Sequence, residues 1–337
     1  MHKPIVVAIG GNSLIRAGQR GTIEEQRANA LVTARAIVAL VRSGRTIVIT
    51  HGNGPQVGAQ LLRSELAAPQ VMPEPLDVCG ADTQGAIGYV LEQALRHALA
   101  DAGLQTPVAT VVTQVVVDAH DPAFQRPTKP VGPFYSEAEA RQRAQAYGWT
   151  MVEDAGRGWR RVVPSPDPHA IVEIDIIRRL ARAGYIVIAA GGGGIPVVQR
   201  NGELLGVEAV IDKDLAAALL AGLLCASVLV ISTDVDRVYL HYRRAGERPL
   251  GRIRAATLRQ YAAEGHFPPG NMGPKIDAAL RFLATGGRRV IITSPELLLE
   301  AVNGCAGTHI LPDRAPAYYG GGARQAVAER PRRRSPA

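Results

Sequence analysis

Lysine is rare in this chain of 337 residues, and its few positions could carry chemistry. Lysine occurs at positions 3, 129, 213 and 275, although 38 residues are Lys or Arg. Ammonium groups held on loops or helix starts can neutralise the oxygens of a phosphoryl group in transfer. We therefore predict that Lys129, Lys213 and Lys275 act on a phosphorylated ligand. Lys3 precedes the first predicted strand and is interpreted as part of a solvated chain end.

The triplet Asp212-Lys213-Asp214 precedes an Ala/Leu-rich run and predicts a helix start. Asp212 is a good N-cap, and a carboxylate such as Asp214 is favoured in the first turn. Lys213 opposes the helix dipole there, which is tolerable when an anion binds at the same helix end. Taken alone, the triplet fits a solvated helix start better than an anion site. The glycine loops elsewhere in the chain favour the anion site.

Three glycine-rich loops each follow a predicted strand directly, at residues 10–13, 51–55 and 191–196. In an open α/β sheet, ligands gather at the carboxyl ends of the strands. Glycine lets the backbone approach an anion closely. The chain has neither the G-x-x-x-x-G-K-[ST] nor the G-x-G-x-x-G pattern, which argues against a P-loop enzyme and a dinucleotide-dependent dehydrogenase.

Strands alternate with helices along the chain, which predicts an α/β fold with a doubly wound sheet. Thr22–Glu25 forms a capping box, and Asn201-Gly202 predicts a hairpin turn. Residues 118–168 are rich in Pro, Gly and charge, and we interpret them as a protruding insertion. Strands are expected at 4–9, 45–50, 108–117, 185–190, 227–232, 289–293 and, at the sheet edge, 307–311; helices are expected at 22–41, 56–66, 81–100, 169–183, 212–224, 255–265, from about 275 to 285, and at 296–302.

Composition limits the classes of protein to consider. Hydrophobic residues make up 47% of the chain and aromatic residues 4%, so aliphatic side chains must fill the core. Three scattered cysteines predict no disulfide framework and favour a reducing cytoplasm. Half of the net charge of +8 lies in residues 321–337, which carry five Arg and one Glu. We therefore expect a disordered basic tail, and neither a nucleic acid nor a membrane as partner.

Several longer motifs carry a resemblance that extends from residue 5 to about 310. The chain resembles the carbamate kinase branch of the amino acid kinase family. The two insertion motifs are the most specific to this branch. The motifs are Ala8–Asn12, Thr50–Gly58, Thr83–Tyr89, Ala109–Asp118, Pro127–Pro133 (P-T-K-P-V-G-P), Glu153–Arg160 (E-D-A-G-R-G-W-R), Gly191–Val198, Val207–Asp214 and Pro269–Lys275.

This resemblance implies a three-layer α/β/α sandwich with a mainly parallel central sheet. A single fold would cover residues 1–312, with an acceptor lobe at about 1–205, the insertion at 118–168 and a nucleotide lobe at about 206–312. The tail would be 313–337. The implied reaction is reversible phosphoryl transfer between carbamoyl phosphate plus ADP and carbamate plus ATP. The family also implies a homodimer, and ATP formation in arginine catabolism.

The resemblance assigns roles position by position. Lys129, Lys213, Asp214 and Lys275 would be catalytic, with Asp214 orienting the lysines. Magnesium would be carried with ATP or ADP rather than by protein ligands. Asp236 could contact the nucleotide or only cap a turn. The substrate-binding residues would be Gly10, Gly11, Asn12, Gly52, Asn53 and Gly54, and the nucleotide-binding residues Thr233, Asp234, Tyr239, Met272 and Lys275.

Three other functions are compatible with parts of the sequence. A kinase of another small carboxylic acid, such as acetylglutamate, would share the glycine loops, but the insertion motifs count against it. A non-catalytic sensor of a nucleotide or of carbamoyl phosphate would share the fold, yet the retained lysines count against it. Nucleic-acid binding through the Arg-rich tail is the third alternative, and we expect no specific binding there.

Overall fold

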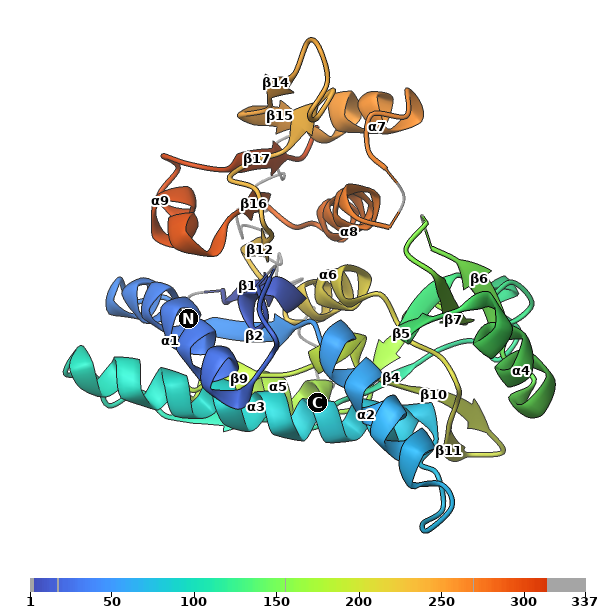
Figure 1. The fold of residues 1–337 in the computed structure, drawn as a ribbon. Helices are drawn as coiled ribbons and strands as arrows, with labels where there is room; N and C mark the ends of the chain where they lie inside the picture. Colours follow the sequence, from blue (N-terminus) through green and yellow to red (C-terminus); the bar gives the residue numbers. More distant parts are fainter. Residues whose placement is uncertain (1–2, 17, 155, 269, 314–337) are drawn as a thin grey trace, which may run out of the picture.

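The computed structural model describes residues 3–16, 18–154, 156–268 and 270–313, and its central feature is one eight-stranded sheet (Figure 1). All neighbouring strands of this sheet pair in parallel except β16 and β17, so the predicted mainly parallel sheet is confirmed. The order is β15 (Arg252–Arg254), β17 (Thr308–Leu311), β16 (Arg289–Thr293), β12 (Val228–Ser232), β1 (Ile5–Ile9), β2 (Ile47–His51), β9 (Ile186–Ile188) and β3 (Val108–Thr110).

The sheet is covered by helices on both faces, which gives three layers. Along β1, Val6 and Ala8 face one core, whereas Ile5, Val7 and Ile9 face the other, as the two-residue strand period requires. Both faces are buried, so these strands are continuous apolar runs. The first core includes α5 (Ile174–Arg182), α6 (Lys213–Leu223) and α8 (Met272–Ala284); the second includes α1 (Ile23–Arg42), α3 (Leu76–Asp101) and α9 (Leu298–Val302).

Local sequence signals place several of these helices. The predicted capping box at Thr22 and Glu25 is present at the start of α1. Asp212 caps α6, because its side chain accepts a hydrogen bond from the Asp214 backbone N–H at 2.8 Å. Among the described residues, no helix combines the length and the apolar character that a bilayer crossing requires. Two further helices are α2 (Gly54–Ala67) and α7 (Ala255–Ala263).

The predicted insertion forms a small unit of its own beside α2 and the start of α6 (Figure 1). Its three-stranded sheet has the order β5 (Lys129–Tyr135), β7 (Trp159–Val163), β6 (Thr150–Glu153), and α4 (Glu137–Tyr147) joins β5 to β6. A further sheet connects this region to the main body through β11 (Glu203–Gly206), β10 (Ile195–Arg200), β4 (Gln114–Val116) and β8 (Ala170–Ile171), and a short ladder pairs β13 (Tyr239–Leu240) with β14 (Arg248–Pro249). The hairpin predicted at Asn201-Gly202 joins β10 and β11, with positive φ at both residues.

Two predicted elements are wrong in extent. The single strand expected at residues 108–117 is two strands, β3 and β4, in different sheets. The backbone of Thr113 between them is bound by the Gln84 side chain, which ends one ladder before the next begins. The helix expected at 169–183 begins only at Ile174, because residues 170–171 pair with β4 as a strand.

One predicted strand position is also wrong. β17 was expected at the sheet edge, but it lies between β16 and β15. The edge strand β15 is three residues long and was not predicted from the sequence. The predicted tail lies outside the described residues except for Asp313, which accepts hydrogen bonds from the Ala256 N–H and from Arg259.

Candidate active site

The glycine loops after β1, β2 and β9 meet at the carboxyl end of the central sheet. Gly11 lies in the turn η1 (Gly11–Ser13), and Gly52 precedes the start of α2. A Cβ atom on Gly52 would lie 3.0 Å from the Gly11 backbone nitrogen, so glycine at residue 52 lets these two loops approach each other closely. The loop after β9 continues the same surface, with Gly192 packed against Asn53.

These loops form one wall of a cavity of about 250 Å³, and three of the four lysines line it. The helix starts of α2 and α6 also face this cavity, so backbone N–H groups and positive helix ends surround it. The cavity is therefore suited to an anion of the size of a phosphoryl group with a small acceptor. Its lining includes Gly11, Gly52, Asn53, Gly54, Lys129, Val131, Gly192, Val210, Asp212, Lys213, Asp214, Asn271 and Lys275.

Two lysines converge on one buried carboxylate in this cavity. Lys213 Nζ lies 2.6 Å from Asp214 Oδ1, and Lys275 Nζ lies 3.2 Å from Asp214 Oδ2. The two ammonium groups therefore stand on either side of the same carboxylate. Lys213 opens α6 and Lys275 lies near the start of α8, so two rigid helices fix their positions.

Charge balance explains why Asp214 stays ionised although only 3% of its surface is exposed. Burial raises the pKa of the Asp214 carboxyl, but the ammonium groups of Lys213 and Lys275 and their hydrogen bonds outweigh this, and the pKa falls to about 2. The cluster has two positive groups and one negative group. Its net positive charge is available to a bound anion.

Lys129 reaches the same cavity from the insertion. Its Nζ lies 2.7 Å from Asp212 Oδ2, while Asp212 Oδ1 accepts the Asp214 N–H at the start of α6. One carboxylate thus links the insertion to the helix that carries Lys213. Lys129 is more exposed than the other two lysines, at 35% of its side chain against 14% for Lys213 and 12% for Lys275.

A second cavity, of about 520 Å³, adjoins the first and has a different character. Asn271 lines both cavities, so they lie next to each other at the start of α8. Tyr239 is held by a hydrogen bond from its hydroxyl to Asp236 Oδ1 at 2.7 Å. The mixture of aromatic and basic side chains suits a planar base with an anionic extension. Its lining includes Thr233, Asp234, Arg237, Tyr239, His241, Tyr242, Arg243, His266, Phe267 and Met272.

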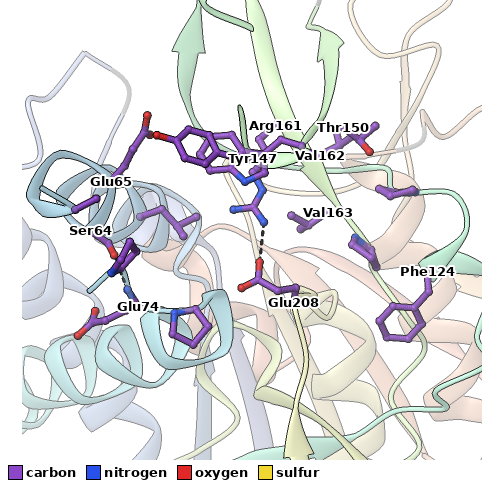
Figure 2. Close-up of a pocket in the computed structure, with 18 residues that line it drawn as sticks. Ser64, Glu65, Glu74, Phe124, Tyr147, Thr150, Arg161, Val162, Val163 and Glu208 are labelled. Carbon is purple, nitrogen blue, oxygen red and sulfur yellow. Dashed lines mark hydrogen bonds and ion pairs between the residues drawn. The ribbon is translucent and has the colours of Figure 1, made fainter. Parts of the chain in front are cut away.

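A larger cavity of about 710 Å³ lies outside the predicted site, between α2, the start of α3 and the insertion (Figure 2). Its lining is mainly apolar and contains none of the lysines. The cationic cluster therefore does not lie in the largest of these three cavities. We assign the chemistry to the smaller cavity, because charge stabilisation of a transferring phosphoryl group requires positive groups at the reacting atoms.

Comparison with known proteins agrees with this geometry. The amino acid kinase family model matches residues 3–294. The chain belongs to the amino acid kinase family. It is 51% identical over 313 residues to the carbamate kinase of Thermococcus kodakarensis, covering 92% of this chain and 99% of the relative. A carbamate kinase-like protein of Escherichia coli is 50% identical, covering 92% of this chain and 99% of the relative.

Solved structures give the same result. The carbamate kinase of Giardia lamblia bound to AMP-PNP is 43% identical and superposes with a TM-score of 0.88, covering 93% of this chain and 99% of that one. The predicted membership of the carbamate kinase branch of the amino acid kinase family and the predicted phosphotransferase class are therefore confirmed.

The structure brings most of the predicted site residues together. Among the predicted substrate-binding residues, Gly11, Gly52, Asn53 and Gly54 line the smaller cavity. Gly10 precedes the adjoining turn, and the backbone of Asn12 belongs to that turn. The Asn53 amide donates to the Thr83 hydroxyl at 2.8 Å. The predicted nucleotide residues Thr233, Asp234, Tyr239 and Met272 line the second cavity, whereas Lys275 lines the first.

Several residues of the smaller cavity were not predicted as site residues, among them Asp212, Gly192 and Asn271. Asp212 was predicted only as a helix cap, although it also binds Lys129. Gly192 and Asn271 stand inside recognised motifs but were given no role. The sequence did contain a signal for this second role. An acidic residue directly before a helix start can bind either a backbone N–H of the helix or a nearby cationic side chain. Asp236 braces Tyr239 and Arg237 rather than lining either cavity.

Proposed function

We propose that the protein transfers a phosphoryl group reversibly between carbamoyl phosphate and ADP, giving carbamate and ATP. The observation that carries this proposal is the convergence of Lys213 and Lys275 on Asp214, beside glycine loops in a cavity of about 250 Å³. The many similar carbamate kinases support it independently.

In the proposed reaction, the bond between the carbamoyl oxygen and phosphorus breaks as a bond forms to a terminal oxygen of ADP. The protein needs to hold both partners in line and to stabilise the negative oxygens in flight. The loops at Gly11 and Gly52–Gly54 would hold the carbamoyl end. Lys213 and Lys275 would flank the moving group, and Asp214 would keep them in place without being consumed.

Lys129 would close the acceptor side of the cavity. In the structure it is bound to Asp212, within the lining of the same cavity. A long, flexible ammonium side chain can turn from this carboxylate to a substrate oxygen through rotation of its own bonds. We therefore assign it to binding of carbamoyl phosphate more than to the transition state.

The second cavity would hold the nucleoside part of ADP or ATP. Its aromatic and basic lining suits an adenine ring and the attached phosphates, and Asn271 marks the passage to the lysine cluster. The similar Giardia protein is bound to AMP-PNP. Thr233, Asp234, Tyr239 and Met272 would contact the nucleotide.

Magnesium enters the proposal as part of the substrate. The described residues contain no group of three or more His, Cys, Asp or Glu side chains placed to hold a metal ion. Asp212 and Asp214, which line the reacting cavity, are both engaged by lysines. The phosphates of the nucleotide, rather than protein side chains, would therefore coordinate the ion, which would bind as MgADP or MgATP.

The remaining proposals concern the context of the reaction. We propose an acceptor lobe at about residues 1–205 and a nucleotide lobe at about 206–312, with the insertion at 118–168 covering the acceptor. We also propose a cytoplasmic homodimer that makes ATP in arginine catabolism. Exposed Tyr89 and Val112, near the edge strand β3, support an association between copies, which light scattering would detect.

A coupled assay tests the proposed function. Purified protein mixed with carbamoyl phosphate, ADP and Mg²⁺ should form ATP, and leaving out any one of the three should abolish it. Acetylglutamyl phosphate in place of carbamoyl phosphate tests the alternative kinase. ATP formation from acetylglutamyl phosphate alone would replace the proposal by that alternative, and binding without turnover would favour a sensor.

A further inference from the structure

Besides its contacts with α2, the insertion is attached to the main body through one short segment of chain. Residues 208–212 lead into α6, and three of them bind the insertion. Glu208 Oε2 accepts from Arg161 Nη2 at 2.6 Å, the Val210 N–H donates to the Pro164 carbonyl at 2.9 Å, and Asp212 binds Lys129 at 2.7 Å. This segment therefore connects the insertion directly to the helix that carries Lys213.

Strand register places Lys129 and Arg161 on one face of the insertion's sheet. Lys129 pairs with Val163, and Val131 pairs with Arg161, in the antiparallel ladder of β5 and β7. Directly opposed residues share a face of the sheet, and so do residues two apart on one strand. Lys129 and Arg161 therefore project from the same face, as do Val131 and Val163, which pack with Val57 and Leu76 of the main body.

The Arg161–Glu208 ion pair crosses a gap in this packing. The cavity of about 710 Å³ lies here, and Figure 2 shows the pair spanning it. Where this cavity separates the insertion from the main body, apolar contacts cannot hold the two together. The ion pairs that cross here, Arg161–Glu208 and the Arg143–Glu65 pair to α2, therefore supply more of the geometric restraint than they would in a filled interface.

Both members of the pair are oriented by further contacts. The Arg161 guanidinium lies over the Trp149 ring, 4.6 Å from its centroid, and its side chain is 14% exposed. Glu208 uses its second oxygen, Oε1, to accept the Leu76 N–H at the start of α3, at 2.7 Å. The pair therefore ties the insertion both to the 208–212 segment and to the main body.

We propose that Arg161 and Glu208 are positioning residues, which set the place of Lys129 over the acceptor cavity from outside that cavity. This inference rests on the proposed function. If the ion pair is removed, the end of the insertion that carries Arg161 keeps the Val210–Pro164 hydrogen bond but loses its charged restraint. Lys129, which shares the same face two residues along the ladder, is then held less closely over the acceptor cavity. The lysine pair on Asp214 and the nucleotide cavity do not depend on this connection.

The test uses the full chain and kinetics with each substrate varied in turn. Arg161→Met keeps length and apolar bulk but removes the charge; Glu208→Gln keeps an acceptor for the Leu76 N–H and serves as a second variant. Each is expected to lower kcat/KM for carbamoyl phosphate about 10-fold while leaving the KM for ADP unchanged. Glu137→Gln, which removes the exposed Glu137–Arg141 pair on α4, is the matched control and should match the wild type.

Combining Arg161→Met with Lys129→Ala separates a positioning role from a general loss of structure. If Arg161 acts through Lys129, Arg161→Met should cause no further loss in a Lys129→Ala protein. Wild-type kinetics in Arg161→Met and Glu208→Gln, equal losses toward both substrates, or a full additional loss in the Lys129→Ala background would each overturn the proposal. Absence of ATP formation by the wild type would instead overturn the proposed function and, with it, this inference.

Discussion

The cavity holds its lysines in two different ways. Lys213 and Lys275 share the buried carboxylate of Asp214 and stand at the starts of α6 and α8, which pack into the main core. Lys129 lies on a strand of the insertion and is bound to the more exposed Asp212. The main body thus fixes the positive charges of Lys213 and Lys275 in the cavity, whereas the insertion brings the charge of Lys129 to the same cavity. We therefore expect the buried pair to control the chemical step and Lys129 to control the acceptor.

Removing Lys213 should have the largest effect of the changes considered. Lys213→Ala takes away one of the two ammonium groups that flank the proposed transferring phosphoryl group. The loss of one such donor costs ~100-fold or more in turnover. The coupled ATP-forming assay measures it, and near wild-type turnover would remove Lys213 from the mechanism.

Asp214→Asn should reduce turnover by roughly 30-fold, because the two lysines would repel each other and shift from their positions. It should also change stability in acid. The pKa of Asp214 is lowered to about 2 from 3.8, so its ionisation stabilises the fold above about pH 4, and this contribution is lost as the pH falls toward 2. The difference is on the order of 2 kcal/mol.

Denaturant unfolding between pH 5 and pH 2 measures this dependence. The wild type should lose stability more steeply than Asp214→Asn over that interval. Asp154→Asn in the insertion is the matched control; the pKa of this partly exposed carboxyl is lowered mainly by the hydrogen bond from Arg157. Equal acid slopes in the wild type and Asp214→Asn would show that the buried ion cluster contributes nothing to stability.

Glycines in the main body and in the insertion should also differ in their tolerance of substitution by alanine. Gly193, with φ of +99°, has no room for a Cβ, which would lie 2.3 Å from the Ile211 carbonyl oxygen. Gly132 in the insertion has φ of +76° but nothing within 4 Å of that position. We expect Gly193→Ala to cost about 2 kcal/mol or more and Gly132→Ala about 1 kcal/mol. Thermal unfolding of both variants would decide; equal costs would show that space is not the limiting factor.

Lys129→Ala should have a smaller effect on turnover than Lys213→Ala. We expect kcat/KM for carbamoyl phosphate to fall by about 10-fold, which corresponds to one hydrogen bond to a charged group. The KM for ADP should stay the same, since the nucleotide cavity is lined by other residues. A loss in kcat equal to that of Lys213→Ala would show that all three lysines act on the transition state.

Deletion of residues 314–337 should have the smallest effect. The truncated protein keeps Asp313 and its contacts with Ala256 and Arg259. Its turnover should equal that of the full chain, and a gel-shift assay should find no sequence-specific DNA or RNA binding in either. Specific binding by the full chain that disappears on truncation would restore the nucleic-acid alternative.

The central sheet could be predicted from sequence because its signals are local. Buried parallel strands appear as continuous apolar runs, and Asp212 and the Thr22–Glu25 box mark helix starts. The division of residues 108–117 between two sheets could not be predicted in this way. It depends on the distant Gln84 side chain, which binds the backbone of Thr113.

The residues of the site could be predicted from the sequence better than the contacts between them. Spacing and residue type singled out the lysines and glycine loops, which the structure places around one cavity. The partnership of Lys129 with Asp212 joins residues 83 positions apart, and that of Arg161 with Glu208 joins residues 47 positions apart. Such pairs follow from the packing of the insertion, which no local pattern specifies.

The most direct test of the central claim is a crystal structure with MgADP, carbamate and a planar aluminium fluoride, which mimics a phosphoryl group in transfer. We expect the fluoride ligands to lie about 3 Å, a hydrogen-bond distance, from the Nζ atoms of both Lys213 and Lys275, with Asp214 still between them. A mimic that binds out of reach of either ammonium group would contradict the account.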